Sequence, residues 1–260
     1  MKAVFEEYRE RYAGFAKLGR KDGLLEIRLH RNDGPCVFDG EIHAGLGDLF
    51  ADVGADLDNR LIIFTGTGDR FLRADDMDMS VMEKYLPYTP AMHLPTMPES
   101  IRLIENFLRI EVPVISVING PATVHAEIPV MADIVLASED AFFADPFHFR
   151  NGIVPGDGVQ VIWPILMGLN RARHFLITGQ EISAGHALQI GFVNEVLSRE
   201  TVMDRAREIA ASMLEQPDVT LRATRMIFAR NLLKAIREDL PLGLALEGLG
   251  NVNHWPITLK

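Results

Sequence analysis

Residues 119–158 read NGPATVHAEIPVMADIVLASEDAFFADPFHFRNGIVPGDG, and this stretch indicates most about the fold. It follows the apolar run Val114–Ile118 and contains a second one, Ile134–Ala137, with a glycine- and proline-containing segment between them. Short apolar runs of this kind are typical of buried strands, and strands joined by turns and helices favour a layered α/β fold with right-handed crossovers. Because ligands bind at strand ends in such folds, the polar residues of 119–158 are candidates for a site.

The sequence before this stretch predicts two more strands and a helix. Leu24–His30 alternates between apolar and polar residues, which predicts a strand, and Val37 and Phe38 are expected to continue it as a hairpin after a turn. Apolar residues recur at helical spacing over 41–57, and Leu61–Thr65 is a short apolar run that predicts another buried strand. The first twenty residues are polar and aromatic, and we expect them to form a helix or an arm packed on the body.

Residues 66–96 contain three prolines and many methionines without a regular period, so we expect an irregular loop there. A loop of this length in a compact domain is usually functional or mobile. The amphipathic pattern over 98–110 then predicts a helix.

The last third of the chain is expected to be mainly helical. Its apolar spacing predicts long helices over 199–215 and 219–238, and a proline and a glycine at positions 241 and 243 are expected to interrupt the pattern. The organisation expected is an α/β core with an N-terminal arm over residues 1–198 and a helical region over residues 199–260.

Composition excludes several classes of protein. The chain has 260 residues, of which 48% are hydrophobic and 24% charged, so it is long enough for one large core and is not expected to be disordered. Its net charge of −10 gives no general attraction for phosphate backbones or anionic lipid, and we expect neither nucleic acid nor membrane as a partner. One cysteine, no apolar leader at the N-terminus and no long apolar run fit a cytoplasmic location.

Familiar cofactor and nucleophile motifs do not account for the chain. Gly66-Thr67-Gly68 follows a predicted strand, but Phe71 occupies the last position of a GxGxxG pattern, and neither a phosphate-binding GxxxxGK nor a GxSxG elbow is present. The eight histidines are scattered, with no HxH or HExxH spacing, so no metal and no cofactor are expected. His125 and Glu127 could touch only if their segment is not helical.

His148 is the strongest candidate base that the residues alone suggest. It lies among four phenylalanines, and an imidazole in apolar surroundings tends to stay neutral, which suits a general base. Asp157, within Gly-Asp-Gly, could orient it. The alternative is structural: a hydrogen-bonded histidine near aromatic rings and an aspartate that serves as a turn residue or helix cap.

Several motifs in a fixed order resemble the crotonase (enoyl-CoA hydratase/isomerase) superfamily. The resemblance covers about residues 22–250 and implies an α/β fold with a ββα superhelix core and a helical C-terminal trimerisation region. It also implies a homotrimer or a dimer of trimers, although an apolar stripe on the predicted C-terminal helix would suit an intramolecular core equally. The motifs are FLRADD (71–76), PVISVINGP (113–121), EIPVMADIVLA (127–137), GIVPG (152–156) and LITGQEISAGHALQIGFV (176–193).

Departures from the hydratase pattern resemble the β-diketone hydrolase branch of that superfamily. The glycine-rich turns that hold a thioester oxyanion in hydratases are replaced by residues 73–76 and 123–126, and His148 stands where one catalytic glutamate is expected. Three stretches match the branch instead: NGPATVHAEIPVM (119–131), HFRNGIVPGDG (148–158) and LGLALE (242–247). The resemblance implies that water cleaves a carbon–carbon bond between two carbonyls, a retro-Claisen reaction, without coenzyme A.

The branch resemblance also implies a role for each site residue. His148 is expected to be the base and Asp157 its orienter, while His125 would donate a hydrogen bond to a substrate oxygen and Glu247 would bind water or relay a proton. Phe38 stands where the branch has a pocket tryptophan. The alternatives are an enoyl-CoA hydratase or isomerase acting on an acyl-CoA thioester, and a catalytically inactive crotonase scaffold kept for assembly.

Overall fold

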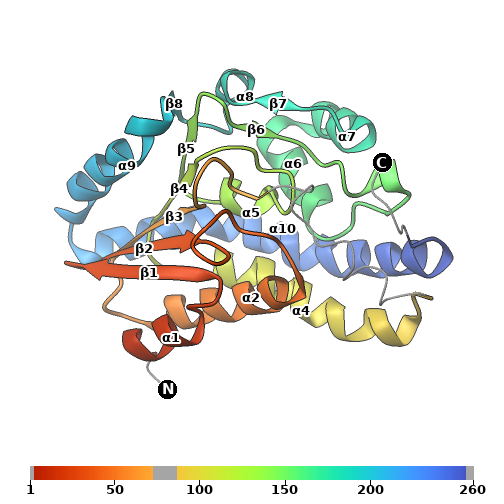
Figure 1. Ribbon diagram of the computed structural model, residues 1–260, viewed down its shortest axis with the longest axis horizontal. Helices are drawn as coiled ribbons and strands as arrows, with labels where there is room; N and C mark the ends of the chain where they lie inside the picture. The colour runs from red at the N-terminus through yellow and green to blue at the C-terminus, as the bar shows by residue number, and fades with distance from the viewer. Residues whose placement is uncertain (1–2, 73–86, 256–260) are drawn as a thin grey trace.

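The computed structural model describes residues 3–72 and 87–255 and contains a six-stranded sheet (Figure 1). The strand order is β1-β2-β3-β4-β5-β8; β1 and β2 are antiparallel, and the remaining neighbours are parallel. All four strands predicted before residue 140 are confirmed apart from the hairpin continuation. The strands are β1 (Ala16–Lys21), β2 (Leu24–Leu29), β3 (Leu61–Thr65), β4 (Val114–Ile118), β5 (Ile134–Ser138) and β8 (Glu195–Leu197).

Helices cover both faces of this sheet, which explains why β3 and β4 are buried throughout and consist mainly of apolar residues. On one face, Phe64 of β3 packs edge to face against Phe50 of α2 (Gly40–Ala55) and Phe107 of α4 (Pro90–Leu108) lies beside both rings. On the other face, neighbouring Ile63 belongs to a separate apolar cluster beneath α9 (Arg199–Leu214). Successive strand residues point to opposite faces, so a strand covered on both sides needs no polar alternation.

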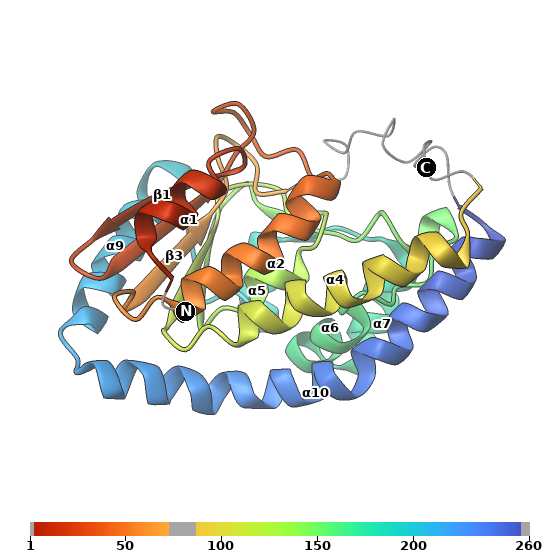
Figure 2. The same ribbon diagram turned by 90° about the horizontal axis from the view of Figure 1, so that it is seen from below.

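The remaining elements complete the layers and carry the loops of the site. Helix α10 runs along the length of the molecule and packs against α4 and α6 (Figure 2). A short two-stranded sheet pairs β6 with β7. These elements are α1 (Phe5–Arg11), α5 (Glu127–Val130), β6 (Phe142–Phe143), η2 (Phe149–Asn151), α6 (Val159–Met167), α7 (Leu169–Thr178), β7 (Ile182–Ser183), α8 (Ala184–Ile190) and α10 (Asp218–Asn253).

The hairpin predicted through Val37 and Phe38 is wrong. The antiparallel partner of β2 is β1, within the first 21 residues, and not the segment that follows the turn. Asp39 instead caps α2 by accepting a hydrogen bond from the Ile42 N–H, so residues 35–39 lead into a helix. This path brings Phe38 to the site described below.

Two helix boundaries also differ from the prediction. Helix α4 begins at Pro90 rather than at residue 98, because a proline is readily accommodated at the first position of a helix. Helix α10 continues through Pro241 and Gly243 to Asn253. Gly243 is a packing residue rather than a break: a Cβ there would collide with the carbonyl oxygen of Gly156 and with Gln160.

Within residues 3–72 and 87–255, no helix combines the length and the apolar character that crossing a membrane requires.

Candidate active site

A cavity of about 210 Å³ lies between α2, α4, α10 and the loops that follow β4 and β6. Its lining includes every site residue predicted from the sequence: His125, His148, Asp157, Glu247 and Phe38. They come from four separate parts of the chain. The site thus forms near the ends of the central strands, where α/β folds generally bind ligands.

His148 lies between two carboxylates. Its Nδ1 is 2.8 Å and 2.9 Å from the two oxygens of Asp145, and its Nε2 is 3.3 Å from Oδ2 of Asp157. Burial lowers the pKa of the imidazole, but the two negative charges outweigh burial and hold the pKa well above its usual value. The two carboxylates therefore favour the protonated form of His148 and stabilise the imidazolium that forms when this side chain takes up a proton.

His125 occupies a strained turn before α5. Its φ of 46° is in the left-handed region, which favours glycine, so the turn keeps a conformation suited to glycine while carrying an imidazole. Nδ1 is 2.7 Å from Oε1 of Glu127, which is possible because the helix begins only at Glu127. Burial lowers the pKa of His125, but the adjacent Glu127 and Asp157 raise it to about 9. Burial raises the pKa of Glu127 in turn, while His125 opposes that rise.

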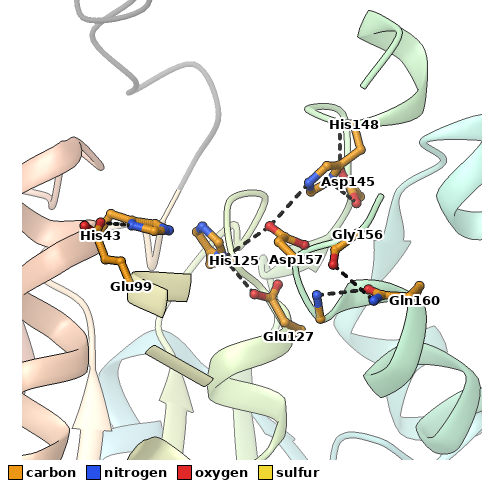
Figure 3. A network of polar contacts seen from close by, with 10 residues as sticks. His43, Glu99, His125, Glu127, Asp145, His148, Gly156, Asp157 and Gln160 are labelled. Atoms are coloured by element: carbon orange, nitrogen blue, oxygen red, sulfur yellow. Dashed lines mark hydrogen bonds and ion pairs between the residues drawn. The ribbon is translucent and has the colours of Figure 1, made fainter. Parts of the chain in front are cut away.

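Asp157 lies between the two histidines (Figure 3). Its Oδ2 is 3.3 Å from His148 Nε2 and 3.7 Å from His125 Nδ1, and the residue is only 8% exposed. Burial would raise the pKa of this carboxyl, but its ion pairs with His148 and His125 outweigh burial and hold the pKa well below its usual range. Asp157 is therefore the fixed negative charge of the site.

Glu247 reaches the site from α10. The close approach of Gly243 to Gly156 lets the helix backbone lie against the loop that carries Asp157. Burial, and to a lesser degree the nearby negative charge of Asp157, raise the pKa of Glu247 to about 8. At neutral pH this carboxyl is protonated and can donate a hydrogen bond.

Three buried polar atoms of the site have no hydrogen-bond partner among the described residues: His148 Nε2, Asp157 Oδ1 and Glu247 Oε2. One nitrogen or carboxylate oxygen atom from each of the same three side chains lies within 4.8 Å of the other two. A small polar molecule placed between them could bond to all three. Water is the smallest molecule that fits this requirement.

The same spacing could accommodate a metal ion, as could His125, Glu127 and Asp157, whose donor atoms also lie within 4.8 Å of one another. A metal binds neutral imidazole and ionised carboxylate, whereas the neighbouring carboxylates raise the pKa of both histidines and favour their protonated forms. A metal would thus compete with protons for both imidazoles.

Three residues of the cavity were missed by sequence reasoning: Asp145, His43 and Glu99. Asp145 could have been found from the sequence, because an aspartate followed by proline often forms a turn. In such a turn its side chain accepts a hydrogen bond from a backbone N–H further along, here that of His148. His43 of α2 is hydrogen-bonded through Nδ1 to Glu99 of α4, and its ring lies 5.5 Å from that of His125. No local pattern relates residues that are 56 positions apart.

Phe38, Tyr88 and Trp255 give the cavity an apolar wall. The Phe38 ring lies 4.8 Å from the His125 ring, and Tyr88 stacks on Trp255 at 4.5 Å. The described lining contains no lysine and no arginine. The described lining therefore combines an apolar wall with the histidines and carboxylates named above. The replaced oxyanion turn at residues 73–76 lies outside the described residues.

This arrangement occurs on a recognisable scaffold. Residues 19–245 match the family model described as enoyl-CoA hydratase/isomerase, and the chain belongs to that family, the crotonase superfamily. A carnitinyl-CoA dehydratase of Salmonella paratyphi A is 28% identical over 243 residues, which cover 93% of this chain and 89% of that protein.

Among solved structures, a beta-diketone hydrolase from the cyanobacterium Anabaena sp. is similar at a TM-score of 0.91 and 39% identity, over 95% of this chain and 97% of that chain. That structure contains bound (S)-3-oxocyclohexyl acetic acid. An enoyl-CoA hydratase/isomerase from Mycobacterium paratuberculosis gives a TM-score of 0.82 at 27% identity, over 92% and 94% of the two chains. The chain is thus an enzyme of the crotonase family with a close structural likeness to a diketone hydrolase.

Proposed function

We propose that the protein is a β-diketone hydrolase, which uses water to cleave the carbon–carbon bond between two carbonyls without coenzyme A. The observation that carries the proposal is the convergence of His148 Nε2, Asp157 and Glu247 at one end of an apolar cavity. These groups suit a water molecule placed beside a small substrate. The likeness to the Anabaena beta-diketone hydrolase, whose bound ligand is a keto acid, supports the same chemistry.

The first step is the attack of water on one carbonyl carbon. Water is a poor nucleophile at neutral pH, so neutral His148 removes a proton as the new carbon–oxygen bond forms. The carbonyl π electrons move to oxygen and give a tetrahedral oxyanion. Glu247, in its protonated form, donates a hydrogen bond to a reacting oxygen at this end of the site. Asp157 stabilises the imidazolium that His148 becomes.

The second step breaks the carbon–carbon bond. The oxyanion collapses to a carboxylic acid, and the electron pair of the broken bond moves to the neighbouring carbon, where the second carbonyl delocalises it as an enolate. The proton that His148 took from water is returned to that carbon, which gives a keto acid and restores neutral His148. His125 is an imidazolium whose Nδ1 is held by Glu127, so its Nε2–H can donate to an oxygen on which charge develops.

The pH dependence of the reaction provides a test of Glu247. Because ionised Glu247 cannot donate, kcat/KM of the wild-type protein is expected to fall as pH rises through about 8. Glu247→Gln keeps a donor that does not ionise, so its fall is expected to move upward to the pKa of His125, about 9. Initial rates across the alkaline range measure this shift. A fall that stays near 8 in the glutamine variant would contradict the assignment.

We also propose that the protein assembles as a homotrimer or a dimer of trimers. The apolar residues of α10 differ in their exposure: Leu221 and Ile236 are buried within the chain, whereas Met226 and Ile227 are more than half exposed. Phe228 beside them is 67% exposed. Exposed apolar side chains clustered on one helix support burial against another subunit.

A panel of monocyclic and bicyclic 1,3-diketones, followed by ultraviolet absorbance, tests the proposed reaction. Loss of diketone absorbance without added coenzyme A is expected. Crotonyl-CoA, a substrate for the alternative hydratase activity, should not be turned over. Turnover of crotonyl-CoA with no loss of any diketone would favour the hydratase.

A further inference from the structure

We propose that Asp145 is the positioning residue that fixes the orientation and tautomer of His148, and that Asp157 lies instead on the side of the ring where water reacts. The inference rests on the proposed function and assigns to Asp145 the role that the sequence suggested for Asp157. It follows from which ring nitrogen each carboxylate faces.

Asp145 holds His148 at three points. Both carboxylate oxygens lie within 2.9 Å of Nδ1, and Oδ1 also accepts a hydrogen bond from the backbone N–H of His148 at 3.1 Å. Asp145 is 6% exposed and His148 is 5% exposed. An imidazole bonded in this way keeps a proton on Nδ1 and leaves the lone pair of its neutral form on Nε2.

Asp157 cannot fix the ring in the same manner. It faces Nε2 at 3.3 Å, and Nε2 has no hydrogen-bond partner among the described residues. A nitrogen that must accept the proton of water cannot also be the one held by the orienting carboxylate. Nε2 is therefore the reactive nitrogen, and Asp157 shares its side of the ring with Glu247.

The loop that carries Asp145 is itself held firmly. The Asn151 amide donates to the carbonyl oxygens of Pro146 and Phe147 at 2.6 Å and 3.0 Å, and the carbonyl oxygen of Asn151 accepts from His254 near the end of α10. These bonds fix the backbone between the aspartate and the histidine. A rigid support of this kind is what an oriented general base requires.

Charge provides the readout that separates a positioning role from a structural one. His148 is faced by Asp145 on its own loop, Asp157 before α6, Glu247 on α10 and His125 before α5. Burial lowers the pKa of His148, and Asp145 is the largest influence that raises it. Removal of that charge must therefore lower the pKa of the base, whereas loss of a purely structural contact would not.

Asp145→Asn tests the proposal, because asparagine can still accept the backbone hydrogen bond while it loses the charge. We expect kcat to fall by about 10²- to 10⁴-fold with little change in KM, and the acid limb of kcat/KM to move to lower pH. Asp140→Asn is the matched control, since Asp140 is exposed and pairs with Arg199 away from the cavity. A kcat within about threefold of wild type, with an unmoved acid limb, would overturn the proposal.

Nitrogen-15 NMR of the histidine rings gives a second readout that requires no substrate. Wild-type His148 is expected to show a persistent Nδ1–H that is lost or exchanges faster in Asp145→Asn but remains in Asp140→Asn. If this signature is present and no diketone is hydrolysed, the proposed function fails while the positioning role stands. If diketones are hydrolysed and the signature is the same in all three proteins, the positioning role fails alone.

Discussion

His148→Ala is expected to reduce kcat/KM for a 1,3-diketone by about 10³-fold or more, because the proposed base, which would take the proton of water, is removed. Phe38, Tyr88 and Trp255 still line the cavity in this variant, so the loss should be largely in kcat. Steady-state kinetics on any diketone that the wild-type protein cleaves measure the effect.

His186→Ala is the matched control for this substitution. His186 is exposed on α8 and does not line the cavity, so this variant should keep wild-type activity. Circular dichroism and thermal unfolding should show that both variants are folded. If folded His148→Ala retains more than about a tenth of the wild-type rate, another group is the base.

Asp157→Asn is expected to reduce kcat/KM by about 10²- to 10³-fold. Asp157 is the carboxylate that both imidazoles share, so its neutralisation removes the charge that stabilises protonated His148 and His125 at once. The pKa of each histidine should fall as a result, which NMR titration of the ring protons can follow independently of activity.

Combination of the two substitutions distinguishes a shared step from separate effects. If Asp157 acts through His148, the double variant should be scarcely worse than His148→Ala alone. Fully additive losses would mean that Asp157 contributes to the reaction by a route that does not involve His148.

Local sequence patterns were sufficient to predict most strands of the sheet. Apolar runs such as Leu61–Thr65 can only be buried strands or buried helical segments, and their shortness favours strands. The pattern could not reveal β1, because Ala16–Lys21 has alternating burial but few apolar side chains. Nor could it show that α10 continues past Pro241, since contact between Gly243 and the distant Gly156 is a tertiary feature.

The candidate site was only partly accessible to sequence reasoning. Family motifs brought His125, His148, Asp157 and Glu247 together, and the structure places all four at one cavity. Which nitrogen of His148 each carboxylate faces depends on the three-dimensional path of the loop between residues 145 and 157. The pairing of His43 with Glu99 depends on the packing of α2 against α4, which no spacing in the sequence encodes.

Hydrolysis of a cyclic 1,3-diketone in water enriched in oxygen-18, followed by mass spectrometry of the product, tests the central claim most directly. The expected product is a ring-opened keto acid that carries a single oxygen-18 in its carboxyl group after one turnover and is formed without coenzyme A. Recovery of unchanged diketones across the panel, together with hydration of an enoyl-CoA ester by the same preparation, would contradict it.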